Sequence, residues 1–165
     1  RELTQGEVGV IEIRGPNVFK GYWRQPEKTA AEFRDGFFIS GDLGRSDQRG
    51  YVSIVGRQKD LIIAGGFNVY PAEVEDAIGE LDLVREVAVI GIPHPDLGEA
   101  VVAVVVLREP GYNDPAGILG ALADKLARFK QPRQILFTAE LPKNAMGKVQ
   151  KAELRNRHAR LFTAS

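Results

Sequence analysis

The pattern of apolar and polar positions divides the chain into two regions of different character. Up to about residue 56, apolar residues alternate with polar ones over short stretches such as 8–13. Alternation with a period of two is typical of half-buried β-strands. Asp35-Gly36 is a turn signal between such stretches, and Pro26 begins a short helical pattern. We therefore predict a β-rich first region with one short helix and no self-sufficient core.

The second region has longer apolar runs. Residues 84–92 and 100–107 are rich in β-branched side chains, and the turn-forming segment 93–98 between them predicts a hairpin. Helical spacing follows Pro71, Asp114-Pro115 and Lys148, and short core strands are predicted at 61–63 and 135–137. The apolar face of the second helix is predicted to extend to Leu126 and Phe129. These patterns predict a compact α+β domain that reaches the C-terminus.

Composition then excludes several classes of function. The chain has 165 residues, with 22 Lys+Arg against 22 Asp+Glu, so no net charge favours nucleic acid or an anionic membrane. Cysteine is absent and only two histidines occur, which excludes thiolate catalysis and makes a multi-histidine metal site a poor hypothesis. No apolar run reaches the roughly 20 residues that a membrane-spanning helix needs. We predict a cytoplasmic protein that binds neither membrane nor nucleic acid.

Two polar sites in the first region are candidates for ligand binding. Asp42 follows Gly41 at the end of an apolar strand, where a carboxylate can accept hydrogen bonds from a diol or simply cap a turn. Arg57 and Lys59 flank Gln58 on an expected strand edge, which would point both cations to one face. Such a guanidinium can bind phosphate or ribose oxygens, or form an ordinary surface ion pair with Asp60.

Two glycine-containing segments add further candidates. Gly65-Gly66 precedes a helix, which fits an anion nest, a tight turn, or a place where a narrow ligand passes close to the backbone. Lys148 follows Gly147 in a Pro-Lys-x-x-x-Gly-Lys run that is not a Walker motif. It is either a mobile point charge for a phosphate or an exposed lysine. His94 is interpreted as a turn residue.

These segments together resemble the adenylate-forming superfamily of acyl-CoA synthetases, peptide-synthetase adenylation domains and luciferases. The resemblance rests on motifs that occur in order over almost the whole chain: 21–23, 26–29, 35–42, 50–51, 56–60, 65–75 and 141–148. The segments Gly-Gly-Phe-Asn-Val-Tyr-Pro and Asn-Ala-Met-Gly-Lys-Val-Gln-Lys are most similar to those of malonyl-CoA synthetases and related acyl-CoA ligases.

The resemblance implies a particular domain organisation. Residues 1–57 would be the β-rich end of the large ATP- and acyl-binding domain, and residues 58–60 would be a hinge. Residues 61–165 would form the mobile C-terminal lid, a small mixed sheet packed by helices. The phosphate loop, the Mg²⁺ ligands and the acyl pocket of the family have no counterpart in this chain, so no metal ligand is expected in it. The missing N-terminal domain would be the partner of the lid, and the chain alone is expected to be inactive.

The resemblance also implies a two-step reaction. A carboxylate attacks the α-phosphate of Mg-ATP to form an acyl-adenylate, and the CoA thiol then attacks that intermediate. Asp42 and Arg57 would bind the nucleotide ribose, Lys59 would be the hinge, and Lys148 would be the catalytic lysine of adenylation. A set of five residues would contact CoA: Gly65, Gly66, Phe129, Lys130 and Arg133.

The predicted function is therefore an AMP-forming acid–CoA ligase that uses ATP, Mg²⁺ and CoA and acts on malonate or a related small acid. Three alternatives stay open: an adenylation domain of a peptide synthetase, a medium- or long-chain fatty acyl-CoA synthetase, and a small α+β module that only binds a partner.

Overall fold

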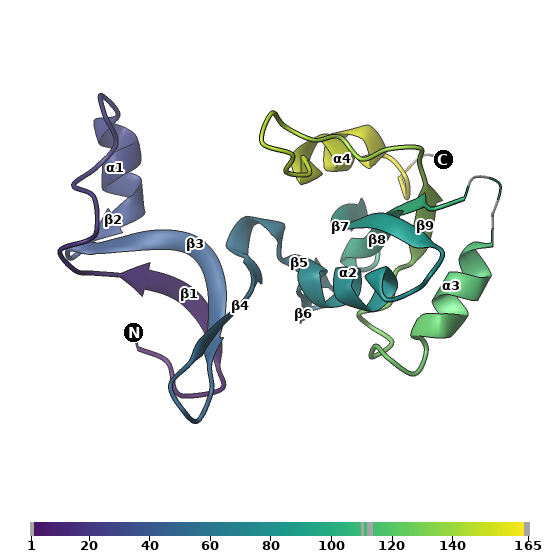
Figure 1. Ribbon diagram of the computed structural model, residues 1–165, viewed down its shortest axis with the longest axis horizontal. Helices are drawn as coiled ribbons and strands as arrows, with labels where there is room; N and C mark the ends of the chain where they lie inside the picture. Colours follow the sequence, from purple (N-terminus) through teal and green to yellow (C-terminus); the bar gives the residue numbers. More distant parts are fainter. Residues whose placement is uncertain (1, 110, 112–113, 164–165) are drawn as a thin grey trace. The chain divides into compact units, whose positions relative to one another are not determined.

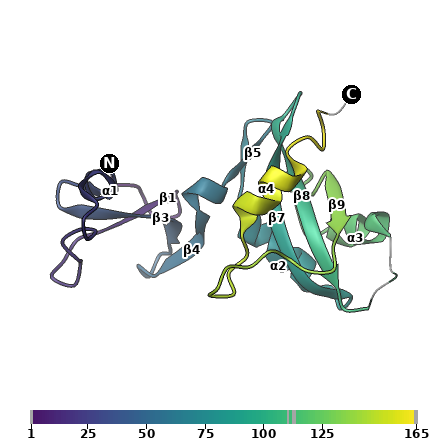
Figure 2. The same ribbon diagram turned by 90° about the horizontal axis from the view of Figure 1, so that it is seen from above.

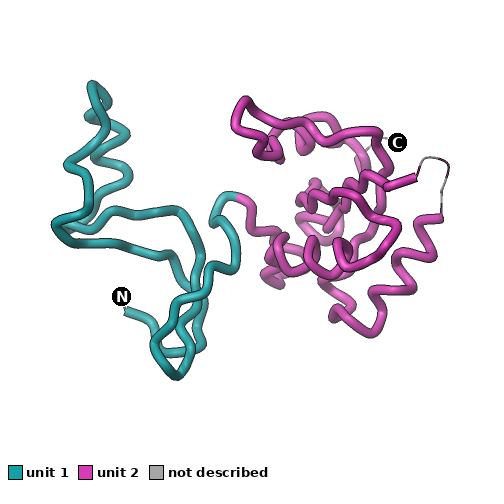
Figure 3. The backbone as a smooth tube through the Cα atoms, viewed as in Figure 1, with its two compact units in different colours: residues 1–59 teal, residues 60–165 magenta. Residues whose placement is uncertain are grey.

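The computed structural model describes residues 2–109, 111 and 114–163 and divides the chain into two compact units. The first unit comprises residues 1–59 and the second comprises residues 60–165 (Figure 3). The boundary lies between Lys59 and Asp60, within the short 3₁₀ helix η1 (Gln58–Asp60). Each unit is described by itself below.

The first unit is a four-stranded antiparallel sheet built around one long strand. β3 (Phe37–Ser46) pairs with β1 (Val8–Ile13), β2 (Phe33–Arg34) and β4 (Val52–Arg57), and α1 (Pro26–Glu32) precedes β2 (Figure 1). Pro26 is the first helical residue of α1, where its missing N–H has no partner to lose. A β-bulge interrupts the pairing of β3 with β4 between Leu43 and Gly44.

The first unit buries little apolar surface. Among the described residues of this unit, Leu43 is the one hydrophobic side chain in the buried core. Edge-to-face rings of Phe19, Tyr22, Phe33 and Phe38 pack together beside α1. Trp23 is 83% exposed and Ile54 is 68% exposed.

The second unit has a five-stranded mixed sheet with β8 (Gly98–Leu107) at its centre. β8 pairs antiparallel with β7 (Val84–His94) and parallel with β9 (Gln134–Phe137). β5 (Ile62–Ala64) pairs with the start of β8 and carries the edge strand β6 (Phe67–Val69). Three helices complete this unit: α2 (Pro71–Gly79), α3 (Pro115–Leu122) and α4 (Lys151–His158).

Helices cover both faces of this sheet. Val101, Ala103 and Val105 of β8 pack in one core cluster with side chains of α2 and α3. The alternate residues Val102, Val104 and Val106 pack in a second cluster with Leu154 of α4. Figure 1 shows α4 above the strands with α2 and α3 below them, and Figure 2 shows α4 in front of β7 and β8. A strand buried on both faces has a continuous apolar run, which explains why β8 does not alternate.

The predicted fold class is confirmed: the second unit is α+β with a small mixed sheet packed by helices. The predicted helix starts at Pro26, Pro71 and Pro115 are also found, and Asp114 Oδ1 accepts a hydrogen bond from the Gly117 N–H as a cap. One detail is wrong. α3 ends at Leu122, so Leu126 is buried beyond the helix and Phe129 is not part of its apolar face.

Candidate functional site

Asp42 and Arg57 form a cross-strand pair in the first unit. They are direct partners in the pairing of β3 with β4, and Arg57 Nε lies 3.0 Å from Asp42 Oδ1. The Asp42 side chain is 25% exposed and that of Arg57 is 54% exposed. The Asp42 N–H donates to Ser40 Oγ, which in turn donates to the Ile11 carbonyl. The two groups thus present a fixed carboxylate and a guanidinium with free donors to solvent.

For this segment, one alternative is not found and one expectation is wrong. Arg57 does not pair with Asp60, since Asp60 Oδ1 accepts from Arg155 at 3.0 Å. Arg57 and Lys59 also do not share a strand edge, because β4 ends at Arg57 and Lys59 lies in η1. Side-chain alternation along a strand therefore does not fix the direction of Lys59. Its exposed side chain has no ion-pair partner among the described residues.

Lys148 lies in a tight loop that one asparagine organises. Asn144 Oδ1 accepts hydrogen bonds from the N–H groups of Met146 and Lys148, both at 3.0 Å. The Asn144 N–H donates to the Lys148 carbonyl at 2.9 Å, and a β-bridge joins Lys143 to Val149. Gly147 has φ +76°, a conformation that glycine adopts without strain. The backbone at Lys148 is therefore held in place although its side chain is exposed.

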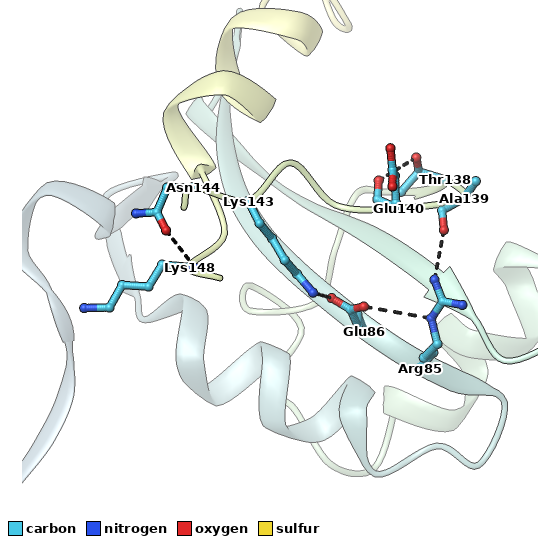
Figure 4. Close-up of polar contacts among 8 residues, drawn as sticks. All are labelled: Arg85, Glu86, Thr138, Ala139, Glu140, Lys143, Asn144 and Lys148. Carbon is cyan, nitrogen blue, oxygen red and sulfur yellow. Dashed lines mark hydrogen bonds and ion pairs between the residues drawn. The ribbon is translucent and has the colours of Figure 1, made fainter. Parts of the chain in front are cut away.

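The ammonium of Lys148 differs from four neighbouring cations. Lys143, Lys151, Arg155 and Arg157 each pair with a carboxylate. Within the described ranges, Lys148 Nζ has no ion-pair or hydrogen-bond partner, and Figure 4 shows its side chain extending away from the Lys143–Glu86 pair. An exposed, unpaired ammonium on a fixed backbone is available to an anionic ligand.

Gly65 and Gly66 form the two-residue turn of the β5–β6 hairpin. Ala64 pairs with Phe67, and the glycines have φ values of +58° and +83°. Positive φ at both central residues defines a type I′ turn, which is the reason for glycine here. The Gly65 N–H donates to the Leu97 carbonyl, which fixes the turn against the β7–β8 connection. A Cβ on Gly66 would meet no atom within 4 Å. The tight-turn interpretation of the sequence is thus what the structure shows.

A cavity of about 520 Å³ opens beside this turn. Three of the five predicted CoA contacts line it: Gly65, Phe129 and Arg133. The Phe129 ring stacks on that of Phe67, with 4.8 Å between ring centroids. The remaining lining is Ala64, Phe67, Leu97, Val101, Arg128, Gln131 and Pro132. Sequence reasoning missed Arg128 and Phe67, although Arg128 directly precedes Phe129 and belongs to the same basic-aromatic run.

The other two predicted contacts are placed differently. Gly66 does not line the cavity, although it neighbours Gly65. Lys130 is engaged by Glu73 of α2, with 2.5 Å between Nζ and Oε1. Its Nζ also lies 5.7 Å from the centroid of the Phe129 ring. Lys130 therefore supports the edge of the cavity instead of offering a free charge to it.

The described residues contain no group of three or more carboxylate or imidazole side chains placed to hold a metal ion. His94 ends β7, and its Nδ1 accepts a hydrogen bond from the Asp96 N–H, which fits the predicted turn role. None of the helices that the structure describes is long and apolar enough to cross a membrane.

Comparisons with known proteins show which family part of the chain resembles. Residues 73–148 match the family described as AMP-binding enzyme C-terminal domain. Indoleacetate–CoA ligase of Aromatoleum aromaticum is 43% identical over 159 residues, covering 96% of this chain and 31% of the relative. Feruloyl-CoA synthase of Amycolatopsis is 47% identical over 155 residues, covering 94% and 32%. The chain thus spans about a third of the length of the curated relatives that it matches.

A solved structure is also similar to this chain in three dimensions. The ATP-bound MatB of Rhodopseudomonas palustris superposes with a TM-score of 0.92 and 55% identity over 99% of this chain and 33% of that one. The chain therefore contains the AMP-binding enzyme C-terminal domain, which residues 73–148 match, in a fold shared with that solved structure.

Proposed function

We propose that this chain is the C-terminal part of an AMP-forming acid–CoA ligase. The longer protein would activate a carboxylate with ATP and then transfer the acyl group to CoA. The observation that carries this proposal is Lys148, whose exposed ammonium has no protein partner in the described part of the chain while its backbone is fixed by Asn144. The relatives with named activities are CoA ligases or synthases, which supports the same reaction class.

Lys148 fits the adenylation step for an electrostatic reason. Negative charge builds on the α-phosphoryl oxygens as the carboxylate attacks, while two anionic groups are brought together. A positioned ammonium stabilises this arrangement more in the transition state than in the ground state. Lys148 would therefore bridge the carboxylate and the α-phosphate. Losing one such contact costs on the order of 3–4 kcal/mol, or about 10²–10³ in rate.

The Asp42–Arg57 pair fits the ribose of the nucleotide. A carboxylate accepts hydrogen bonds from vicinal hydroxyls, and an adjacent guanidinium orients that carboxylate. Both side chains remain partly exposed while paired at 3.0 Å, so a ligand can reach them. We propose that this pair binds ATP and the acyl-adenylate. Mg²⁺ would be held by residues outside this chain.

The cavity beside Gly65 fits the second substrate. Its volume of about 520 Å³ lies within the usual range of ligand sites, about 300–1,000 Å³. Phe129 offers a ring face to a base, and Arg128 and Arg133 offer guanidinium groups to phosphates. We propose that CoA binds here, with its narrow pantetheine arm passing the side-chain-free turn at Gly65 and Gly66.

We also propose that residues 58–60 form the hinge between the two units, with Lys59 as the residue whose backbone angles change. The exposed, unpaired Lys59 lies in a single 3₁₀ turn with the unit boundary directly after it. A short element-terminal segment at the boundary between two units suits a hinge. The movement would bring either Lys148 or the Gly65 turn to the reacting group.

Malonate, or a related small acid, is our proposed acyl substrate. The motif resemblance supports it, and so does the structural similarity to MatB, a malonyl-CoA synthetase. The names of other relatives specify indoleacetate, ferulate or long-chain fatty acids at comparable identity. The C-terminal part is therefore shared by ligases of different acids. The predicted cytoplasmic location stays a prediction.

The test uses the complete protein with ATP, CoA and a panel of carboxylates, and measures AMP, pyrophosphate and thioester. We expect all three products, with malonate as the preferred acid. Amino-acid-dependent pyrophosphate release without a CoA thioester would favour a peptide-synthetase adenylation domain. A preference for long chains would replace malonate by a fatty acid. No carboxylate-dependent pyrophosphate with any acid would contradict the ligase and favour a binding module.

The isolated 165-residue chain should form no acyl-adenylate. It lacks a counterpart of the family's phosphate loop and acyl pocket, and its first unit buries a single hydrophobic core residue among those described. Pyrophosphate exchange by the isolated chain, measured with labelled pyrophosphate, would contradict this prediction.

A further inference from the structure

Two ion pairs attach α4 to the rest of the second unit directly after the Lys148 loop. Lys151 Nζ lies 2.6 Å from Glu75 Oε1 of α2, and Arg155 donates to Asp60 Oδ1 at 3.0 Å. Lys151 and Arg155 are four residues apart, so they lie one turn apart on the same side of α4. The helix thus has two ionic attachments on one face, and Leu154 anchors it in the core between them.

These pairs are more enclosed than the other ion pair of the helix. Their four side chains are between 16% and 29% exposed. The pair of Arg157 with Glu153, which lies on α4 alone, has side chains that are 56% and 40% exposed. Enclosed charges are screened less by salt than exposed ones. An enclosed pair also contributes little net stability once desolvation is counted, so its main effect is to fix geometry.

The partner of Lys151 is held by the sheet, and the partner of Arg155 lies where the second unit begins. Glu75 Oε1 also accepts a hydrogen bond from the Val89 N–H of β7 at 2.7 Å, which connects α4 to the central sheet. Asp60 is the first residue of the second unit and directly follows Lys59. Arg155 therefore connects the helix after Lys148 to the point where the second unit begins.

The N-terminal end of the Lys148 loop is also held in place. Lys143 Nζ lies 2.5 Å from Glu86 Oε2 of β7, and Arg85 beside it donates to the Ala139 carbonyl (Figure 4). The Gln150 N–H donates to the Pro142 carbonyl at 2.8 Å, which closes the base of the loop. The loop that carries Lys148 is thus fixed at both ends, and α4 provides its C-terminal attachment.

We propose that Lys151 and Arg155 are positioning residues for adenylation, and that they act by fixing the place and direction of Lys148. This inference rests on the proposed function, because it assumes that Lys148 acts on the α-phosphate. Neither residue needs to contact a substrate. Arg155 in addition ties this position to Asp60, so that rotation at Lys59 would move the Lys148 loop together with the start of the second unit.

Release of α4 should impair one half-reaction and spare the other. A displacement of about 1 Å at a catalytic group can cost about 10²-fold in rate, even when the mutation lies away from the chemistry. Release of α4 would shift Lys148 but leave the Gly65 turn and Phe129, which lie on other elements, in place. Adenylation should therefore suffer while thioester formation from a ready-made acyl-adenylate does not.

The test compares the two half-reactions in the complete protein. In Arg155→Ala, carboxylate-dependent pyrophosphate exchange should fall about 10–100-fold, and thioester formation from synthetic acyl-adenylate should stay within about twofold. Arg155→Lys, which keeps the charge near Asp60, should recover part of the exchange. Arg157→Ala removes an exposed arginine from the same helix and should leave both half-reactions unchanged. Equal losses in both half-reactions would show a merely structural role and overturn the proposal.

A double-mutant cycle tests whether Arg155 acts through Lys148. If it does, Arg155→Ala should cause no further loss of exchange in a Lys148→Ala background. Independent, multiplying losses would overturn the proposal. Failure of the proposed function would look different, because wild-type protein would then show no exchange or Lys148→Ala would exchange normally. Normal exchange by Arg155→Ala, with Lys148→Ala inactive, would reject the positioning role alone.

Discussion

Removal of Phe129 and Arg133 should weaken CoA binding and leave adenylation intact. Phe129 is 39% exposed and stacks on Phe67, and both residues line the cavity beside the Gly65 turn. Loss of the Phe129 ring, which would stack on the base of CoA, should weaken CoA binding by about 1 kcal/mol. Aromatic contacts contribute about 0.5–1.5 kcal/mol each. The loss of about 1 kcal/mol corresponds to about a fivefold rise in KM for CoA, since each 1.4 kcal/mol is about tenfold.

Arg133 contributes a similar amount for a different reason. Its charged hydrogen bond to a phosphate could contribute about 1.5–3 kcal/mol in an enclosed site. The side chain is exposed, however, so solvent screening lowers the effect to about 1 kcal/mol. If the two losses add, the Phe129→Ala, Arg133→Ala double variant should raise KM for CoA about 25-fold. Because both residues line one cavity, some coupling between them is expected.

The assay follows thioester formation from pre-made acyl-adenylate at increasing CoA concentrations, with pyrophosphate exchange measured in parallel. Arg108→Ala is the matched control, since Arg108 is an exposed arginine of the same unit just beyond the far end of β8. It should leave KM for CoA unchanged. An unchanged KM in the double variant would refute the assignment of this cavity, and an equal loss of pyrophosphate exchange would show general damage instead.

Three predictions concern stability and charge. Leu154→Ala should lower the free energy of unfolding by about 2–5 kcal/mol in urea titrations, because this side chain is 2% exposed in the core under α4. Gly66→Ala should cost about 1–2 kcal/mol because its φ is +83°, whereas Gly79→Ala, with an ordinary helical φ and open space for a Cβ, should cost nothing. The Lys125 ammonium lowers the pKa of Glu80, so this pair stabilises the fold above the unfolded pKa and ceases to do so as pH falls through the folded one. Lys125→Ala should raise the Glu80 midpoint in an NMR titration, and an unchanged midpoint would show that this pair does not form in solution.

Local sequence signals predicted the elements well where the determining interactions are local. Pro71 begins α2, Asp114 caps α3, and Asp35-Gly36 lies at the turn into β3. Each of these residues fixes the backbone by its own chemistry, without a distant partner. The apolar run of β8 likewise indicated a buried strand, since it packs against helices on both faces.

Polar partners were harder to predict because they depend on contacts distant in sequence. One alternative left open by the sequence was an ion pair of Arg57 with Asp60, its near neighbour. In the fold, the β3–β4 register places Asp42 opposite Arg57, and α4 brings Arg155 to Asp60 across 95 positions. The partner of Lys130 is Glu73, 57 positions away, for the same reason. No local pattern contains such pairings.

The candidate site likewise depends partly on local residues and partly on contacts distant in sequence. The loop geometry at Lys148 follows from nearby residues, Asn144 and Gly147, that the motif contains. The cavity that joins Gly65 to Arg133 depends on the packing of β5 beside the segment before β9. Phe67 and Arg128 line the cavity because of this packing.

The most direct test of the central claim is the effect of Lys148→Ala on the two half-reactions of the complete protein. Carboxylate-dependent pyrophosphate exchange should fall about 10²–10³-fold, whereas thioester formation from pre-made acyl-adenylate should be largely retained. Lys125→Ala, which removes a partly exposed lysine paired with Glu80, should leave both unchanged. Unchanged pyrophosphate exchange in Lys148→Ala would contradict the proposed role of this lysine and, with it, the assignment of the site.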